Sequence, residues 1–284
     1  MEWIPRLGDK RPARLTDRLG TGDTIRTAPA SRADLRFNDG SLARIGEQSV
    51  FGFVPNTRTF RLANGTALFL IPPNQGLTTI ETPSAVTNVQ GTALVVRHVA
   101  PLQSNQLSGH LDFGAGGEEA FGRTVVLALT DSGTAPVRVS LLDEKAVNLT
   151  AGQMAIVDRG ELYIFEFDLA LFYQTSSLVN ELNLDNPDYT GSSQPTDAVR
   201  QETLDGLSNQ SDFVGEYLLN PTFFSAADLA IATVPNWLFP LTPLQQVEVP
   251  SDSDIPLPSS TPTETITPGV LVPPEEQETL DSPL

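Results

Sequence analysis

The sequence of 284 residues contains no cysteine and only two histidines, His98 and His110. The absence of cysteine excludes disulfides, thiolate metal sites and cysteine nucleophiles, and it leaves the cellular compartment open. Two imidazoles are too few for a histidine-rich metal site. The sequence also lacks any run of 18 apolar residues, so we expect no membrane-spanning helix.

Basic charge is scarce as well. The chain has 17 Lys and Arg residues against 35 Asp and Glu residues, a formal net charge of −18. Residues 1–100 carry a net charge of +4, residues 101–200 carry −9, and residues 201–284 carry −13. Arg200 is the last basic residue. Because a nucleic-acid-binding surface needs a basic footprint, we expect no nucleic-acid partner.

What the sequence does contain, from residue 14 to residue 99, is short runs rich in Val, Ile, Leu, Phe and Thr, separated by turn residues. This spacing is typical of an all-β domain. The length allows one or two domains with a sizeable core. The predicted strands are Thr24–Thr27, Ala33–Phe37, Leu42–Ile45, Val50–Val54, Thr59–Ala63, Ala67–Ile71, Thr78–Thr82, Val86–Val89 and Thr92–Val99.

The clearest hairpin joins Ala33–Phe37 to Ser41–Ile45 through Asn38-Asp39-Gly40. These three residue types tolerate the positive φ that a tight hairpin turn requires. Apolar and polar residues alternate along both strands, as a half-buried sheet requires. On this pattern Ala43 faces the core and Arg44 points out.

Residues 100–122 read as loop material, and strands then resume. These later strands are Thr124–Leu129, Val137–Leu142, Ala146–Leu149, Gln153–Val157 and Leu162–Phe167. Helical spacing of apolar residues begins near Asp168 and runs to Leu182, before Pro187. A weaker helix is predicted at Thr196–Leu207, and another follows Ser211 and stops at Pro221.

From these patterns we expect three parts: an all-β domain at residues 1–167, a helical extension at 168–222, and an acidic tail at 223–284. From Pro240 onward, 45 residues include 10 Pro and 11 Ser or Thr, with no basic residue and no periodicity. Such a segment buries too little apolar surface to offset its conformational entropy. We therefore predict that the tail is disordered.

Two short motifs imitate enzyme signatures. Leu127–Thr134 contains the Asp131-Ser132-Gly133-Thr134 sequence of aspartic proteases, which need two such carboxylates sharing a proton; a homodimer could supply the second. We interpret Asp131 as a turn residue. Asp112-Phe113-Gly114 imitates a kinase motif, but no phosphate loop or other kinase segment accompanies it, so we interpret it as a strand end entering a loop.

Other side chains leave chemical alternatives open. His98 and His110 could share a metal with Asp112 or Glu118, although an imidazole satisfied by hydrogen bonds or solvated is the simpler interpretation. Glu118 and Glu119 offer carboxylates for glycoside hydrolysis, but no spacing selects a pair. We therefore assign no catalytic, cofactor-binding or metal-binding residue and predict a protein that is not an enzyme.

The aromatic residues are expected to serve as core and helix-packing groups. The pairs Phe223–Phe224 and Trp237–Phe239 have a second interpretation, as docking anchors in a segment that is otherwise disordered. The complete set is Tyr163, Phe165, Phe167, Phe172, Phe223, Phe224, Trp237 and Phe239.

An ordered series of motifs over residues 8–100 resembles the FecR domain family. Its parts are Gly22–Thr27, Phe37 with Asp39-Gly40-Ser41, Arg44-Ile45-Gly46 with Gln48-Ser49, Thr82-Pro83-Ser84-Ala85, and Gly91-Thr92. The resemblance implies an all-β module, roll-like, solenoid-like or sandwich-like, on the outer side of the bacterial inner membrane. The family's name-giving members relay transport signals to a sigma factor.

The sequence departs from the family in several respects. Neither the anti-sigma segment nor the membrane helix of the full-length regulators is present, and the family's usual basic and aromatic residues near the Gly-Thr pair are replaced by Gln90 and Leu94. Because Trp3–Gly8 resembles the domain's first strand, we expect an export signal or membrane helix encoded upstream of Met1. The protein would then be periplasmic or extracellular, and cytoplasmic if Met1 is the true start.

The resemblance leads us to expect a non-enzymatic, envelope-side binding or signalling module with a protein or glycan partner and no cofactor. The alternative is a structural cell-surface or wall-associated protein without a signalling role, and a hydrolase is third. The identity of the partner, a sigma-factor connection and the oligomeric state stay open.

Overall fold

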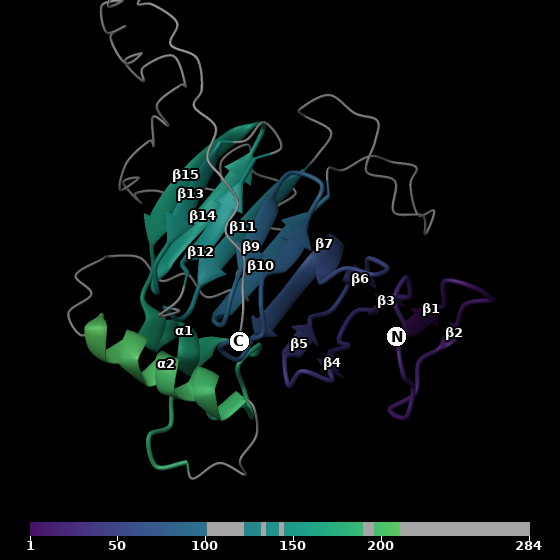
Figure 1. Cartoon of the computed structure of the whole chain (residues 1–284), viewed down its shortest axis with the longest axis horizontal. Helices are drawn as coiled ribbons and strands as arrows, with labels where there is room; N and C mark the ends of the chain where they lie inside the picture. The colour runs from purple at the N-terminus through teal and green to yellow at the C-terminus, as the bar shows by residue number, and fades with distance from the viewer. Residues whose placement is uncertain (101–121, 132–134, 142–144, 190–195, 211–284) are drawn as a thin grey trace, which may run out of the picture. The chain divides into compact units, whose positions relative to one another are not determined.

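The computed structural model describes residues 1–100, 122–131, 135–141, 145–189 and 196–210 (Figure 1). These residues contain fifteen strands and two helices. The strands are β1 (Glu2–Ile4), β2 (Arg11–Pro12), β3 (Thr24–Arg26), β4 (Ala33–Arg36), β5 (Leu42–Ile45), β6 (Val50–Phe53), β7 (Thr59–Leu70), β8 (Thr78–Glu81), β9 (Val86–Val89), β10 (Ala93–Val99), β11 (Arg123–Ala128), β12 (Val137–Ser140), β13 (Ala146–Leu149), β14 (Gln153–Asp158) and β15 (Glu161–Glu166), and the helices are α1 (Leu169–Thr175) and α2 (Thr196–Asn209).

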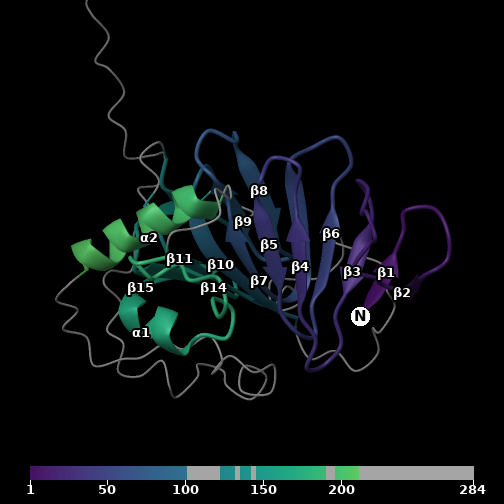
Figure 2. The ribbon, with the colours of Figure 1, turned by 90° about the horizontal axis from the view of Figure 1, so that it is seen from below.

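The strands form two sheets that share β7. The first sheet has the order β2-β1-β3-β6-β7-β8-β9-β12-β13, and the second has the order β4-β5-β7-β10-β11-β14-β15. Neighbouring strands are antiparallel, except that β7 and β8 run parallel. The all-β prediction is confirmed, and a sandwich-like pair of sheets is the form it takes (Figure 2).

Strand β7 passes from one sheet to the other at Gly65. Residues up to Asn64 pair with β6, whereas Gly65 and the residues after it pair with β10 and β5. Gly65 has φ of 95°, and a Cβ there would overlap Ser49. The sequence pattern predicted two separate strands, Thr59–Ala63 and Ala67–Ile71. This prediction is wrong, because Gly65 bends one continuous strand and does not end it.

The core lies between the two sheets. Alternate residues of β10 face opposite sides, so Leu94 and Val96 enter this core while Ala93 and Val95 lie on the outer face of the second sheet. That outer face is not open to solvent, because α1, α2 and the chain between them cover it. The molecule therefore has three layers: first sheet, second sheet and a helical layer.

The predicted hairpin around Gly40 is confirmed. Strands β4 and β5 pair from Ala33–Ile45 to Arg36–Leu42, and Gly40 has φ of 85°. The Asp39 carboxylate accepts a hydrogen bond from the Ser41 backbone N–H at 2.8 Å. Asp39 thus stabilises the turn that its own backbone makes.

Arg44 on β5 points away from the inter-sheet core, as predicted, but it does not reach solvent. Arg44 is only 2% exposed, because the chain after α1 covers it. The guanidinium pairs with Asp34 and donates to the carbonyl oxygens of Leu178 and Asn180. The alternating pattern gave the direction of this side chain but could not reveal the layer above it.

The helix predicted from Asp168 to Leu182 is shorter than expected, since α1 ends at Thr175. Ser176 has an extended backbone, with φ of −79° and ψ of 122°, and its hydroxyl accepts a hydrogen bond from the Leu178 N–H. Serine competes with helical hydrogen bonding in this way. Leu178 and Val179 are nevertheless buried. The apolar spacing after Thr175 therefore predicts correctly which residues are buried, but not that they are helical.

The second predicted helix is confirmed as α2. The helix predicted after Ser211 and the tail at 223–284 lie outside the described residues. Strands β1 (Glu2–Ile4) and β2 (Arg11–Pro12) precede the predicted series, and β1 includes Trp3 and Ile4 of the Trp3–Gly8 segment. The boundary at residue 167 stays a prediction, and in the described part α1 and α2 share buried contacts with the second sheet.

Candidate functional site

Helix α1 follows the last strand directly and is positioned by its N-cap and by aromatic packing. The Asp168 side chain accepts a hydrogen bond from the Leu171 N–H at 3.0 Å, the usual contact of an N-cap carboxylate. Phe172 and Tyr173 are buried, and the Phe172 ring centroid lies 6.0 Å from that of Phe167. The cap and these rings fix where α1 lies on the second sheet.

Helix α2 approaches the sheet closely at Gly206. A Cβ at this residue would lie 3.5 Å from Ala151 Cβ and 3.6 Å from the Leu129 carbonyl oxygen. Val199 and Thr203 are buried on the same helix. A small residue at this point therefore lets the helix backbone sit against strand and turn.

Gln210, just beyond α2, ties the end of this helix to the start of α1. Its Nε2 donates to the Phe167 carbonyl oxygen at 2.9 Å, and its Oε1 accepts from the Leu169 N–H at 2.9 Å. Both halves of the amide are thereby engaged. These two hydrogen bonds fix the position of the end of α2 relative to the start of α1.

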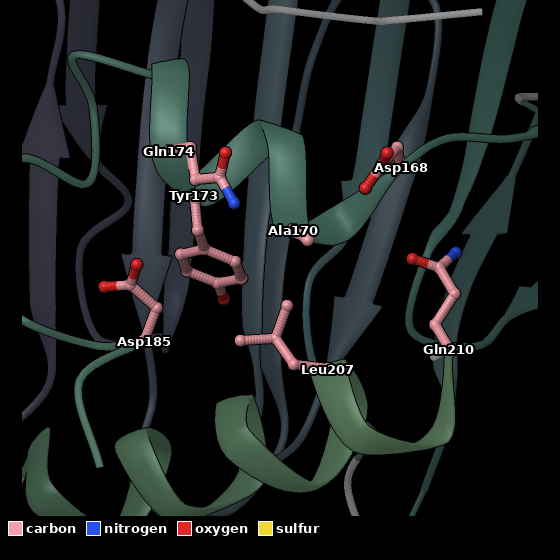
Figure 3. A pocket seen from close by; sticks show the side chains of 7 residues that line it. All are labelled: Asp168, Ala170, Tyr173, Gln174, Asp185, Leu207 and Gln210. Atoms are coloured by element: carbon pink, nitrogen blue, oxygen red, sulfur yellow. The ribbon is translucent and has the colours of Figure 1, made fainter. Parts of the chain in front are cut away.

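A pocket of about 410 Å³ lies between the two helices (Figure 3). Its volume falls within the range of about 300–1,000 Å³ that is usual for small-ligand sites. The Tyr173 side chain projects from α1 toward α2, and Leu207 lies below it. The lining residues are Asp168, Ala170, Tyr173, Gln174, Asp185, Leu207 and Gln210.

The polar groups of this pocket mostly accept hydrogen bonds. Thr203 Oγ1 donates its single hydrogen to the Val199 carbonyl oxygen at 3.0 Å, so Tyr173 is the donor in the 3.3 Å contact between Tyr173 and Thr203. The Tyr173 oxygen then keeps acceptor capacity. Burial raises the pKa of Tyr173, so its hydroxyl stays protonated. Asp168 uses one oxygen for the cap, and the Asp185 carboxylate is exposed.

The pocket lies in an acidic part of the chain. Residues 161–210 contain nine acidic residues and a single basic residue, Arg200. The Arg200 guanidinium donates to the Asn183 carbonyl oxygen and to Asp197, and it lies 4.3 Å from the centroid of the Tyr189 ring. It is therefore held away from the pocket lining.

A second polar group links α2 to the end of β11. Thr92 of the Gly-Thr pair contacts Thr130, whose hydroxyl also accepts from the Ala93 N–H and contacts Glu202 Oε2 at 3.3 Å. Burial raises the pKa of Glu202 to about 7, nearby Asp205 and Asp131 act in the same direction, and the Thr130 contact opposes them. Glu202 is therefore a carboxyl group that titrates near neutrality within the helical layer.

His98 is buried between the sheets. Its Nδ1 lies 2.9 Å from Thr124 Oγ1, and the same hydroxyl contacts Thr82 and Ser84 at 2.7 and 2.6 Å. Burial lowers the pKa of His98 to about 3, so the imidazole is neutral. The hydrogen-bonded imidazole of the simpler interpretation is found at Nδ1 only, because Nε2 is buried and has no hydrogen-bond partner among the described residues. His110, Asp112, Glu118 and Glu119 lie outside the described residues.

Asp131 accepts a hydrogen bond from the Ala151 backbone N–H at 2.7 Å and so braces the turn between β13 and β14. The turn predicted at Asp131 itself continues into residues outside the described ranges, so its interpretation as a turn residue stays a prediction. The remainder of the protease-like motif and the Asp112-Phe113-Gly114 motif lie outside the described residues. The same holds for the aromatic residues from Phe223 onward, whereas Phe165, Phe167 and Phe172 are buried as predicted.

The family-like residues of the first hundred positions hold the fold together. Thr27 donates to the Gly46 carbonyl oxygen at 2.6 Å and accepts from the Ser49 N–H at 2.8 Å. Asp39 forms an ion pair with Arg58. Thr82 closes the tight turn to Ala85 through two hydrogen bonds of 3.0 Å. These contacts agree with a structural role for the motif residues.

Within the described ranges, no group of three or more His, Cys, Asp or Glu side chains is arranged to hold a metal ion. No helix among these residues combines the length and the apolarity needed to cross a bilayer.

The described residues define an all-β module of two sheets with a helical cover. Residues 23–110 match the model of the FecR family, described as FecR protein. The resemblance predicted from the motifs is thereby confirmed, over a segment that includes β3 to β10. No curated protein matches the chain.

Two crystal structures of a candidate anti-sigma factor from Parabacteroides distasonis ATCC 8503 are similar to this chain. Each is 16% identical in sequence and has a TM-score of 0.39. The matches cover 53% and 54% of this chain and 64% of that protein, so the chain spans less than two thirds of its length.

The sequence patterns did not single out the pocket residues. Asp168, Tyr173, Asp185 and Leu207 come from four separate positions that only the packing of α1 and α2 brings together. The signal that was available is the excess of acidic residues from 161 to 210. That excess indicates an acidic surface but not a pocket.

Proposed function

We propose that this chain is a non-enzymatic, envelope-side module of the FecR type that binds a protein or glycan partner in a signalling process. The observation that carries the proposal is the match of residues 23–110 to the FecR family. That match associates the chain with a regulatory protein family. The proposal names no sigma factor and no transporter.

The contacts of the motif residues suggest that different parts of the chain serve stability and partner binding. Thr27, Asp39, Thr82 and Thr92 all make hydrogen bonds that join strands and turns. Side chains engaged in this way contribute to stability and leave little capacity for a partner. The helical layer, with its pocket and its acidic charge, is the better candidate for partner binding.

The location is tested with the full chain in its own organism. Intact and permeabilised cells are treated with a protease, and the chain is followed by antibody. We expect digestion only once the outer barrier has been opened, together with recovery outside the cytosol. Protection in permeabilised cells until the inner membrane is lysed contradicts an envelope-side location.

The signalling role is tested by deleting the gene and measuring all transcripts. A signalling module is expected to change one defined set of genes, and the wild-type gene supplied in trans is expected to restore it. An unchanged transcript profile with altered wall integrity supports the alternative, a structural surface protein. As a control, cells complemented with the variant Arg138→Lys, a change at an exposed site, should behave as wild type.

A further inference from the structure

We propose that the pocket between α1 and α2 receives a basic side chain, arginine or lysine, of the protein partner. This inference rests on the proposed function, in the form in which the partner is a protein. It gives that partner a stated chemistry at a stated place, lined by residues of α1, of α2 and of the chain between them.

Hydrogen-bonding capacity is the first argument. The pocket offers acceptors: the second oxygen of Asp168, the exposed carboxylate of Asp185, and the oxygen of Tyr173, whose hydrogen goes to Thr203. The Gln210 amide is engaged with backbone groups on both sides. An ammonium or guanidinium group brings only donors, so it complements these acceptors.

The Tyr173 oxygen gives this argument its strength. Tyr173 is 5% exposed, yet its side chain lines the pocket, and its oxygen receives no hydrogen bond from Thr203. A mostly buried hydroxyl that donates its own hydrogen and keeps a lone pair beside a cavity can accept one hydrogen bond from an N–H donor. This feature is independent of the two carboxylates and does not follow from surface charge.

The shape of the pocket is the second argument. Ala170, Leu207 and the ring of Tyr173 supply the apolar groups of the lining, and Figure 3 shows the Tyr173 ring and Leu207 between the two helices. Arginine and lysine have apolar stems below a charged end, and such stems favour apolar surface. The pocket volume of about 410 Å³ leaves room for the stem and the charged end together.

Charge distribution is the third argument, and it bears on the origin of the side chain. The chain has no basic residue after Arg200, and Arg200 itself is held by Asn183, Asp197 and the ring of Tyr189. Residues beyond the helical layer thus cannot supply the cation. An acidic surface also accelerates the encounter with a basic partner over distances of about 10 Å or less in physiological salt.

The binding test uses the full chain labelled with ¹⁵N and ¹³C and the peptide acetyl-Gly-Arg-Gly-amide as the probe. We expect saturable shifts at the Tyr173 ring, the Leu207 methyl groups and the Gln174 amide. The matched probe replaces arginine by citrulline, which has nearly the same shape without the charge. We expect its affinity to be at least fivefold lower.

Two variants with their controls separate the pocket from general electrostatics. Asp168→Asn keeps an N-cap residue and Asp185→Asn changes an exposed position, so the double variant should retain its melting temperature. We expect it to bind the arginine peptide at least fivefold more weakly. The control, Asp188→Asn with Glu161→Gln, removes the same charge outside the pocket lining and should stay within twofold of wild type.

The proposal is overturned if the citrulline peptide binds equally well, if both double variants weaken binding to the same extent, or if no probe binds. Sedimentation of the chain alone adds a further outcome: self-association that the Asp168→Asn and Asp185→Asn changes abolish identifies a second copy as the occupant and overturns a separate partner. The location and transcript experiments test the proposed function without the pocket. A transcript response that persists in the double variant rejects the pocket alone.

Discussion

Arg44 illustrates how much one buried side chain can join. It lies on β5, forms a two-pronged pair with Asp34 through contacts of 2.8 Å, and reaches the carbonyl oxygens of Leu178 and Asn180, far along the chain. A guanidinium group suits such a position because its five donors are fixed in one plane. At the residue scale, this contact attaches the helical layer to the second sheet.

Replacing Arg44 by lysine keeps the charge and removes the planar donors. We expect Arg44→Lys to lower the free energy of unfolding by about 1–3 kcal/mol, because at least two buried acceptors lose their partners. Urea unfolding measures the change. Arg138→Lys, at an exposed position of β12, is the control, expected within about 0.5 kcal/mol of wild type. Equal effects of the two substitutions contradict the role assigned to Arg44.

His98 supplies a pH prediction at the same scale. Its pKa is about 3 in the folded chain, lowered by burial, against about 6.5 in the unfolded chain. A lowered pKa means that His98 contributes full stability above pH 6.5 and that this contribution is lost as the pH falls toward 3. Between pH 7 and pH 5 we expect wild type to lose about 2 kcal/mol more than His98→Gln.

Urea unfolding of both proteins at pH 7, 6 and 5 measures this difference. Most carboxyl groups titrate alike in the two proteins and cancel in the comparison. Parallel pH dependence of wild type and His98→Gln shows that the imidazole gains a proton without opening the core, contrary to the prediction.

At the scale of elements, the docking of α2 on the second sheet involves the carboxyl group of Glu202, which lies close to two other carboxylates. Glu202 contacts Thr130 at 3.3 Å, and Asp131 and Asp205 act on it from the turn after β11 and from α2 itself. Thr130 is in turn held by Thr92 and by the Ala93 N–H. The charge of Glu202 therefore bears on how firmly the helix holds to the sheet.

The pKa of Glu202 is raised to about 7 from 4.5, which sets the sign of the pH effect. A carboxyl group with a raised pKa contributes to the free energy of unfolding in full below pH 4.5, and this contribution is lost as the pH rises to 7. We expect Glu202→Gln to stabilise the chain at pH 8 by about 1 kcal/mol, a value reduced for partial solvent exposure, and to have little effect at pH 4.5.

Thermal unfolding at the two pH values measures the effect of Glu202→Gln. Glu166→Gln, at an exposed position on β15, is the matched control and should show no such pH dependence. A ¹³C titration of the Glu202 carboxyl that gives a midpoint below 5 contradicts the prediction directly.

At the scale of the whole molecule, β7 makes the two sheets one cooperative structure. Its first half pairs with β6 and β8 and its second half with β5 and β10, so neither sheet can separate without breaking it. Gly65 is the residue at the crossing. A destabilising substitution at Gly65 is therefore expected to weaken both sheets.

We expect Gly65→Ala to lower the free energy of unfolding by about 2–4 kcal/mol, because Ala is strained at positive φ and its Cβ would overlap Ser49. Gly76 also has a positive φ, of 79°, but no atom lies within 4 Å of an added Cβ. Gly76→Ala thus isolates the backbone contribution and should cost about 1 kcal/mol.

Hydrogen exchange followed by mass spectrometry distinguishes a global from a local effect. In Gly65→Ala we expect faster exchange both in β3 and β6 of the first sheet and in β5, β10 and β11 of the second. Loss of protection in the first sheet alone contradicts a single cooperative structure.

The sequence determined most of the local structure. Alternating apolar residues, the Asn38-Asp39-Gly40 turn and the start of a helix near Asp168 depend on neighbours within a few positions, and such short-range preferences are readable without a fold. The family resemblance was readable for the same reason, because its motifs are turn and strand signals in a fixed order. The acidic excess of residues 161–210 was visible too, as composition.

Only the tertiary structure decided what depends on distant contacts. The continuity of β7, the burial of Arg44 and His98 and the end of α1 at Thr175 each depend on atoms more than fifteen positions away or on a local competition that periodicity does not record. The pocket is the same case, since Asp168 and Leu207 meet only when both helices pack on the second sheet. A one-dimensional pattern gives each residue its side of a strand or helix, and packing decides what lies on that side.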